Sequence, residues 1–116
     1  MVSLIQLIEF SIVVSLSILA GYFIGITTQE EIEKKLRKFP IDKIFSYPLI
    51  AAEVLVILIL LKFAVDYYFL AGNVLIIINI VLSSIYSAKK MDLQRILAYT
   101  IMFLIANLII GTIIII

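Results

Sequence analysis

The positive charges of this chain are confined to two short stretches of an otherwise apolar sequence. Of the nine Lys and Arg residues, eight lie in these stretches: Lys34, Lys35, Arg37, Lys38 and Lys43 in the first, and Lys89, Lys90 and Arg95 in the second. Long runs of aliphatic and aromatic residues flank and separate them. This pattern is typical of a polytopic membrane protein, in which charged connections alternate with helices that cross the lipid.

The composition also indicates a membrane protein, and it excludes several kinds of catalytic and metal-binding site. Of the 116 residues, 65% are hydrophobic and the mean hydropathy is +1.27, whereas a soluble domain is about half apolar. The chain has no Cys and no His, so it lacks thiolate chemistry and the commonest general base and metal or haem ligand. A formal net charge of +1 gives no reason to expect nucleic-acid binding. We therefore expect no cofactor, and no enzyme activity from this chain by itself.

The lengths of the apolar runs predict four transmembrane helices. A hydrocarbon core about 30 Å thick requires about 20 helical residues, and residues 4–26 meet this with one charge, Glu9. The run 47–88 would be about 63 Å long as a single helix, so it must turn back within 66–73. We predict an all-α integral membrane protein, a single domain over 1–116, with transmembrane helices at about 4–26, 47–67, 71–88 and 93–116.

The first polar connection carries a helical pattern of its own. Ile32, Leu36 and Phe39 would share one face of a helix, which makes that face a narrow apolar stripe. The pattern predicts a short amphipathic helix at about 29–39 that lies at the lipid headgroups. This helix is either a solvated connector that fixes the topology or a docking surface for a cytoplasmic partner.

Four helices would place both basic stretches on one side of the membrane. The opposite connection holds a single cation, Lys62. By the positive-inside rule, the loops 27–45 and 89–92 are cytoplasmic, and the N- and C-termini lie outside. We expect a multi-pass protein of the cell membrane, whose partners are the lipid bilayer and either other membrane protein subunits or copies of itself.

Glu53 is the strongest candidate for a functional residue, because an ionisable group inside a membrane is costly. It lies about 9 Å along its helix from Tyr47. If neighbouring helices are antiparallel, Ser83, Ser84 and Thr100 lie at a similar depth, and the four side chains could form one polar layer. The layer is either a structural hydrogen-bond knot or subunit contact, or an intramembrane proton or cation site.

Other polar and small residues indicate contacts between helices. Asn79 and Asn107 would both lie near the midplane and could share a hydrogen bond. Ser17, Gly21 and Gly25 recur every four residues on the first helix, a spacing that lets another helix approach closely. The partner could be the second or fourth helix of the chain, or another subunit.

Glu9, near the outer start of the first helix, is a secondary acidic candidate. In size and helix count the chain resembles the small multidrug resistance transporters, which carry an essential glutamate in their first helix. Glu9 would be the matching residue. The chain departs from that family in having no Trp, a long first connection and a strong charge bias between its two sides, so no residue role is carried over.

Two functions fit these observations. The first is a non-catalytic subunit that packs or anchors within a larger membrane complex, such as an ion-translocating one. The alternative is a homo-oligomeric proton- or cation-coupled transporter or channel that uses Glu53, because oligomerisation would supply the enclosed volume that four helices lack. A membrane enzyme is disfavoured, because Glu53 stands alone, whereas lipid-modifying enzymes bind a metal or phosphate with clustered polar residues.

Overall fold

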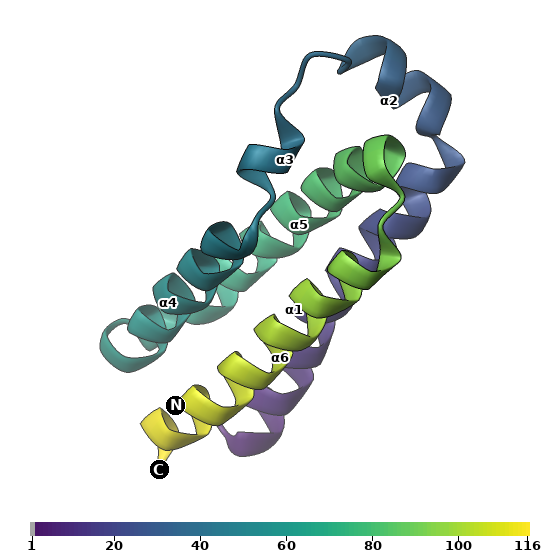
Figure 1. Ribbon diagram of the computed structural model, residues 1–116. Helices are drawn as coiled ribbons and strands as arrows, with labels where there is room; N and C mark the ends of the chain where they lie inside the picture. Colours follow the sequence, from purple (N-terminus) through teal and green to yellow (C-terminus); the bar gives the residue numbers. More distant parts are fainter. Residues whose placement is uncertain (1) are drawn as a thin grey trace.

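The computed structural model describes residues 2–116, and Figure 1 shows them as a bundle of helices. Four longer helices run side by side: α1 (Leu4–Thr27), α4 (Tyr47–Phe63), α5 (Tyr68–Lys90) and α6 (Leu93–Ile115). Three shorter elements connect them: α2 (Gln29–Lys35), α3 (Ile41–Ile44) and the single 3-10 turn η1 (Val65–Tyr67). No strand occurs among the described residues. The molecule measures 47 × 21 × 20 Å, so its long axis exceeds a hydrocarbon core of about 30 Å.

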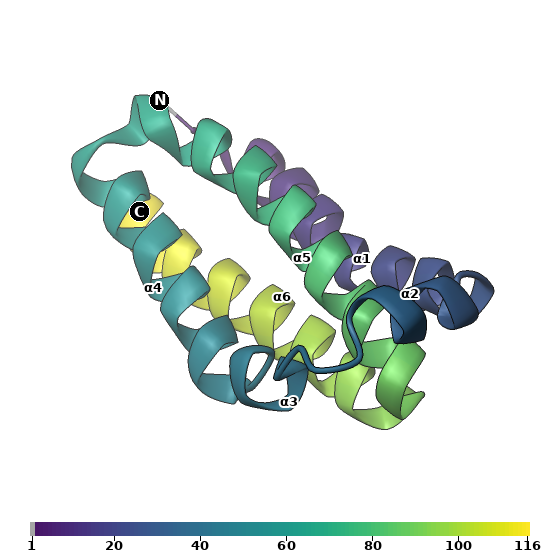
Figure 2. The same cartoon turned by 90° about the horizontal axis from the view of Figure 1, so that it is seen from above.

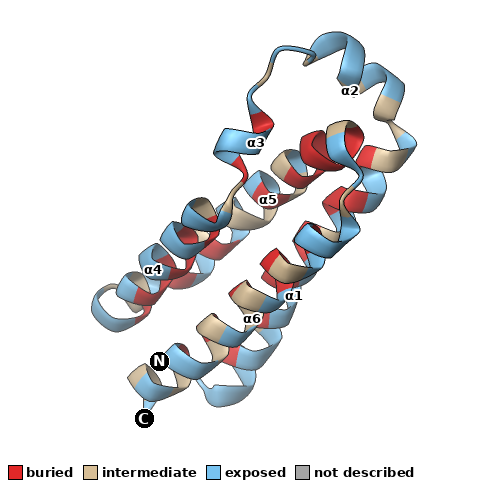
Figure 3. Ribbon diagram, viewed as in Figure 1, coloured by how far each residue is buried: buried red, intermediate tan, exposed pale blue. Residues whose placement is uncertain are grey.

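Three segments of the bundle are long and apolar enough to cross a membrane: α1, Val65–Lys90 and α6. Buried residues face the bundle interior, and exposed residues cover its outside (Figure 3). Much of the exposed surface is aliphatic or aromatic, as lipid-facing surface should be. The expected all-helical fold is therefore confirmed for the described residues, with three helices rather than four that are long and apolar enough to cross a membrane. α4 has 17 residues, or about 25 Å.

The helices are not ordered around the bundle as they are in the chain. α1 packs most extensively against α5, and α6 packs against both α1 and α4, as the view in Figure 2 shows. Phe10 faces Gly72 and Gly21 faces Ser83, so α1 and α5 run in the same direction. The chain reversals before α4 and α6 make those two helices run the opposite way.

The two ends of the bundle differ in charge. We call the end at which α1 and α5 finish and α6 begins the basic end, because both basic stretches lie there. The chain termini lie at the opposite end (Figure 1).

The boundaries of the second and third long helices differ from the expected ones. α4 ends at Phe63 rather than at residue 67, because Ala64, with φ −144° and ψ 65°, leaves the helical region. α5 begins at Tyr68 rather than at residue 71, so most of the range 66–73 in which the turn was expected, including Gly72, lies inside a helix. The ring of Phe10 occupies the space that a Cβ on Gly72 would fill. Gly72 therefore allows α1 to pack closely against α5 and does not form the turn between α4 and α5.

The amphipathic segment after α1 is also shorter than expected. α2 ends at Lys35 rather than at residue 39, because Leu36, with φ −119° and ψ 32°, leaves the helix. Ile32, Leu36 and Phe39 are half-buried and pack against the core of the bundle, and α2 contacts α5. The apolar stripe is therefore turned towards the protein.

Candidate functional site

Gly21 and Gly25 bring α1 directly against α5. A Cβ on Gly21 would collide with the hydroxyl of Ser83, and one on Gly25 with the hydroxyl of Ser87. The small-residue contact is thus formed, but its partner is the third long helix of the chain. The expectation of the second helix, the fourth helix or another subunit was wrong, because α5 runs parallel to α1 and presents its serines at matching heights.

The close approach allows hydrogen bonds from side chains of α5 to the backbone of α1. Ser84 Oγ donates to the carbonyl oxygen of Gly21 at 3.0 Å, and Ser87 Oγ donates to that of Tyr22 at 2.9 Å. All four residues are buried. In the absence of a hydrophobic driving force between helices in lipid, such packing and hydrogen bonding hold helices together.

The expected polar layer around Glu53 is not formed. The hydroxyls of Ser83, Ser84 and Thr100 all donate to backbone carbonyl oxygens. None of the three has a hydrogen bond with Glu53, whose carboxyl oxygens have no partner among the described residues. Similar depth along neighbouring helices therefore did not bring these side chains together.

Asn107 joins three helices instead of pairing with Asn79. Its Nδ2 donates to Ser11 Oγ on α1 and, at 3.1 Å, to the Tyr68 hydroxyl on α5. Ser11, Tyr68 and Asn107 are all fully buried. Sequence reasoning missed Ser11 and Tyr68. Tyr68 stands in the aromatic run 67–69, which is typical of a membrane interface, and nothing in that run marks it as internal.

Within residues 2–116, Glu53 and Asn79 form the one neighbouring pair of buried polar side chains whose groups have no hydrogen-bond partner in the protein. The Glu53 carboxyl on α4 lies next to the Asn79 amide on α5, but the two groups do not reach hydrogen-bond geometry. Glu53 is 6% exposed and Asn79 is 0% exposed. Among the described residues, Ser15 Oγ is the one other buried side-chain polar atom without a partner.

An aromatic cluster lies between this pair and the basic end. The rings of Phe45 and Tyr99 stack with their centroids 4.9 Å apart, and Tyr47 meets Tyr99 edge-on at 4.8 Å. The Tyr99 hydroxyl donates to the carbonyl oxygen of Phe45 at 3.2 Å. Glu53 lies about 9 Å further along α4 than Tyr47, on the side away from the basic end.

The chemistry available at this pair is limited. The described residues contain no group of three or more acidic, His or Cys side chains that could hold a metal ion. Glu9 is exposed on the surface of α1. A lone buried carboxyl beside an amide can bind and release a proton or help to hold a single cation, and such groups inside membranes mark ion and proton pathways.

Comparison of the chain with models of known protein families, with curated proteins and with solved structures found no match.

Proposed function

We propose that the chain is a non-catalytic subunit that packs within a larger membrane complex. The observation that supports this is an open groove of about 420 Å³ between α4 and α5. Its lining is apolar throughout: Val56, Ile57, Leu60, Tyr67, Leu70, Ala71, Val74 and Leu75. Helices associate in lipid by fitting side chains into such surfaces, so the proposed occupant is a transmembrane helix of a neighbouring subunit.

The interior hydrogen bonds are consistent with a packing role. The buried hydroxyls of Ser84 and Ser87 and the amide of Asn107 all link one helix of the bundle to another. These groups stabilise the fold and are not free to act on a substrate. Among the described residues, the buried side-chain polar atoms that remain without partners are those of Glu53 and Asn79 and the hydroxyl of Ser15.

Native mass spectrometry after gentle detergent extraction from the native membrane tests the subunit proposal. The chain is expected to co-purify with other membrane chains at fixed stoichiometry. Val74→Trp, which fills the groove, should release them, whereas Ile77→Trp, on an exposed part of α5 outside the groove, should not. A chain that extracts alone, or that loses its partners equally with both variants, would contradict the proposal.

In this proposal α4 is a fourth membrane-spanning helix, the basic end faces the cytoplasm, and both termini lie outside. A span of about 25 Å is short, but local thinning of the bilayer and snorkelling of flanking residues accommodate such mismatch at modest cost. The positive-inside rule supports the orientation. A reporter fused to the C-terminus should be active outside the cytoplasm, and cytoplasmic activity would overturn this topology.

The unsatisfied carboxyl of Glu53 supports a second candidate, a homo-oligomeric transporter or channel coupled to protons or cations. Partnerless polar groups at the centre of a bundle are costly, so their presence favours a use other than folding. The purified chain alone, reconstituted in liposomes, should then carry protons or monovalent cations. Glu53→Gln should abolish that flux, and equal flux in both proteins would exclude a role for this carboxyl.

A further inference from the structure

Four exposed cations stand together just beyond the membrane-spanning part of the bundle: Lys34, Lys35, Arg37 and Lys38. The segment 34–38 contains no acidic residue. In the part of the chain that the structure describes, the one ion pair joins Lys90 to Asp42, at 3.2 Å. None of the four cations is therefore in a direct ion pair among the described residues, although Glu30, Glu31 and Glu33 lie one helical turn before three of them.

The segment that carries these charges is tied to the end of α5. Lys89 Nζ donates to the carbonyl oxygens of Arg37, at 3.1 Å, and of Phe39, at 2.6 Å. These carbonyls belong to the turn between α2 and α3, outside either helix. Lys89 is the penultimate residue of α5, so the four cations are held near the level at which this spanning helix leaves the lipid.

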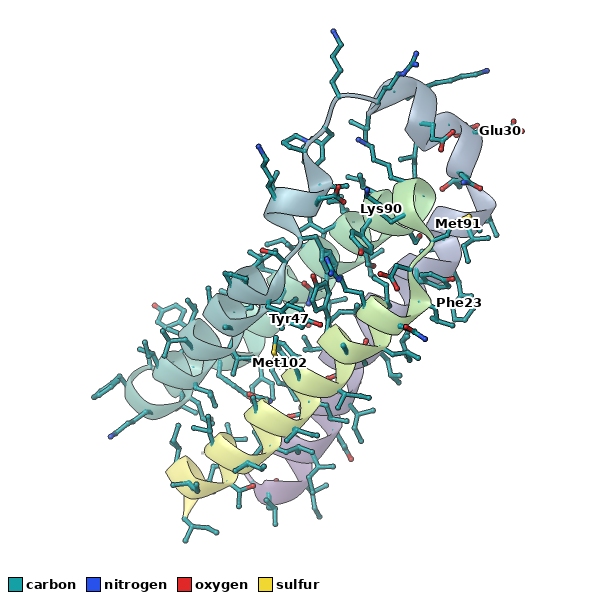
Figure 4. All side chains as sticks on the ribbon, viewed as in Figure 1. Phe23, Glu30, Tyr47, Lys90, Met91 and Met102 are labelled. Atoms are coloured by element: carbon teal, nitrogen blue, oxygen red, sulfur yellow. The ribbon has the colours of Figure 1, made fainter. Side chains whose placement is uncertain are left out.

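The apolar side of the same segment is already occupied. Ile32 and Leu36 pack against the core of the bundle, and α2 contacts α5. Figure 4 shows long side chains tipped with nitrogen extending from α2 and the following connection, and Glu30 pointing away from the bundle. The part of the segment that remains exposed is therefore its positively charged side chains. A ligand that binds there is held by electrostatic attraction and not by contact with an apolar helix face.

We propose that this surface, Lys34, Lys35, Arg37 and Lys38, binds the phosphate groups of anionic membrane lipids. Clusters of Lys and Arg next to a transmembrane helix attract anionic headgroups, and the guanidinium of Arg37 can contact a phosphate through two parallel hydrogen bonds. The acidic residues Glu30, Glu31 and Glu33 all precede the four cations, so the lipid lies towards the C-terminal part of the cluster. The inference depends on membrane embedding but on neither function proposed above.

Native mass spectrometry of the full chain in a neutral detergent, titrated with phosphatidylglycerol or with zwitterionic phosphatidylcholine, tests this surface. The wild-type chain should bind phosphatidylglycerol more tightly. Changing all four cations to Gln should weaken that binding on the order of 10²-fold, because each Lys or Arg near an anionic surface contributes several-fold. Binding of phosphatidylcholine should not change, and added salt should weaken only the phosphatidylglycerol complex.

Matched variants separate loss of charge from loss of fold. Changing Lys34, Lys35 and Lys38 to Arg keeps the charge and should keep the affinity. Changing Glu30, Glu31 and Glu33 to Gln should tighten phosphatidylglycerol binding several-fold. If the fourfold variant does not fold, Lys38→Gln alone should still show a several-fold loss. A wild-type chain that binds the two lipids equally, or folded Gln variants that keep full affinity for phosphatidylglycerol, would overturn the proposal.

Discussion

Replacing Gly21 and Gly25 together by leucine is expected to separate α1 from α5 and to unfold the bundle. The side chain at each position would meet the backbone of α5 as well as a serine hydroxyl, and backbone cannot rotate out of the way. Overpacking of a well-packed site costs about 1–3 kcal/mol, and here two sites one helical turn apart would be overpacked together. The hydrogen bonds from Ser84 and Ser87 to α1 would also be lost.

Unfolding in mixed micelles with increasing SDS, followed by circular dichroism, measures this effect. The double variant should lose its cooperative transition. Ala20→Leu is the matched control, because Ala20 is exposed on α1 and should leave the transition where it is. If the double variant unfolds at the same SDS fraction as the wild-type chain, the direct contact between α1 and α5 is not what holds the bundle together.

The class of the protein and the main packing feature of α1 could be predicted because both depend on local sequence. The length of an apolar run predicts the length of a helix. The spacing of Gly21 and Gly25 predicts a helix face that another helix can approach closely, whichever helix that is. The partner of that face could not be predicted in the same way. It depends on the order of helices around the bundle, in which α1 neighbours α5 and α6, and this order is a property of the whole chain.

For the polar residues, too, position along the helix could be predicted from the sequence but the partner could not. Reasoning from depth placed Asn79 near the middle of its helix, and it is indeed central in α5. Depth along the helix does not say which way a side chain faces, and on depth alone the expected partner of Asn79 was Asn107. The structure instead places Asn79 next to Glu53. Asn107 is hydrogen-bonded to Ser11 and Tyr68. Direction around the helix axis, set by neighbouring helices, decides which polar groups meet.

The position of the turn between α4 and α5 also depends on packing, and it differs from the one expected from local sequence. Gly72 belongs to a residue type that breaks helices in water, and it lies in the range 66–73 within which the chain was expected to turn back. In the bundle, the ring of Phe10 packs where its side chain would be, so close contact explains the glycine. Ala64 carries the actual departure from helical geometry, although its residue type favours helix. At Gly72, tertiary packing overrides local propensity.

Replacing Glu53 by leucine is expected to make the bundle more stable. Both carboxyl oxygens are buried without a partner among the described residues, and an unsatisfied buried polar group costs about 1–3 kcal/mol. Leucine has a similar size, and the same face of α4 already carries the buried Ile50 and Ile57. Asn79→Leu, which removes the other member of the pair, should act in the same direction.

The SDS unfolding transition of Glu53→Leu should move to a higher SDS fraction, by an amount that corresponds to about 1–3 kcal/mol. Glu53→Gln is the control, because it keeps a polar group of the same shape in the same place and should change stability little. A clear loss of stability in Glu53→Leu would show that the carboxyl is a structural hydrogen-bonding group. A gain in stability together with loss of ion flux would favour the transporter candidate, because residues kept at the expense of stability are typical of functional sites. A gain in stability with no flux in either protein would favour the subunit.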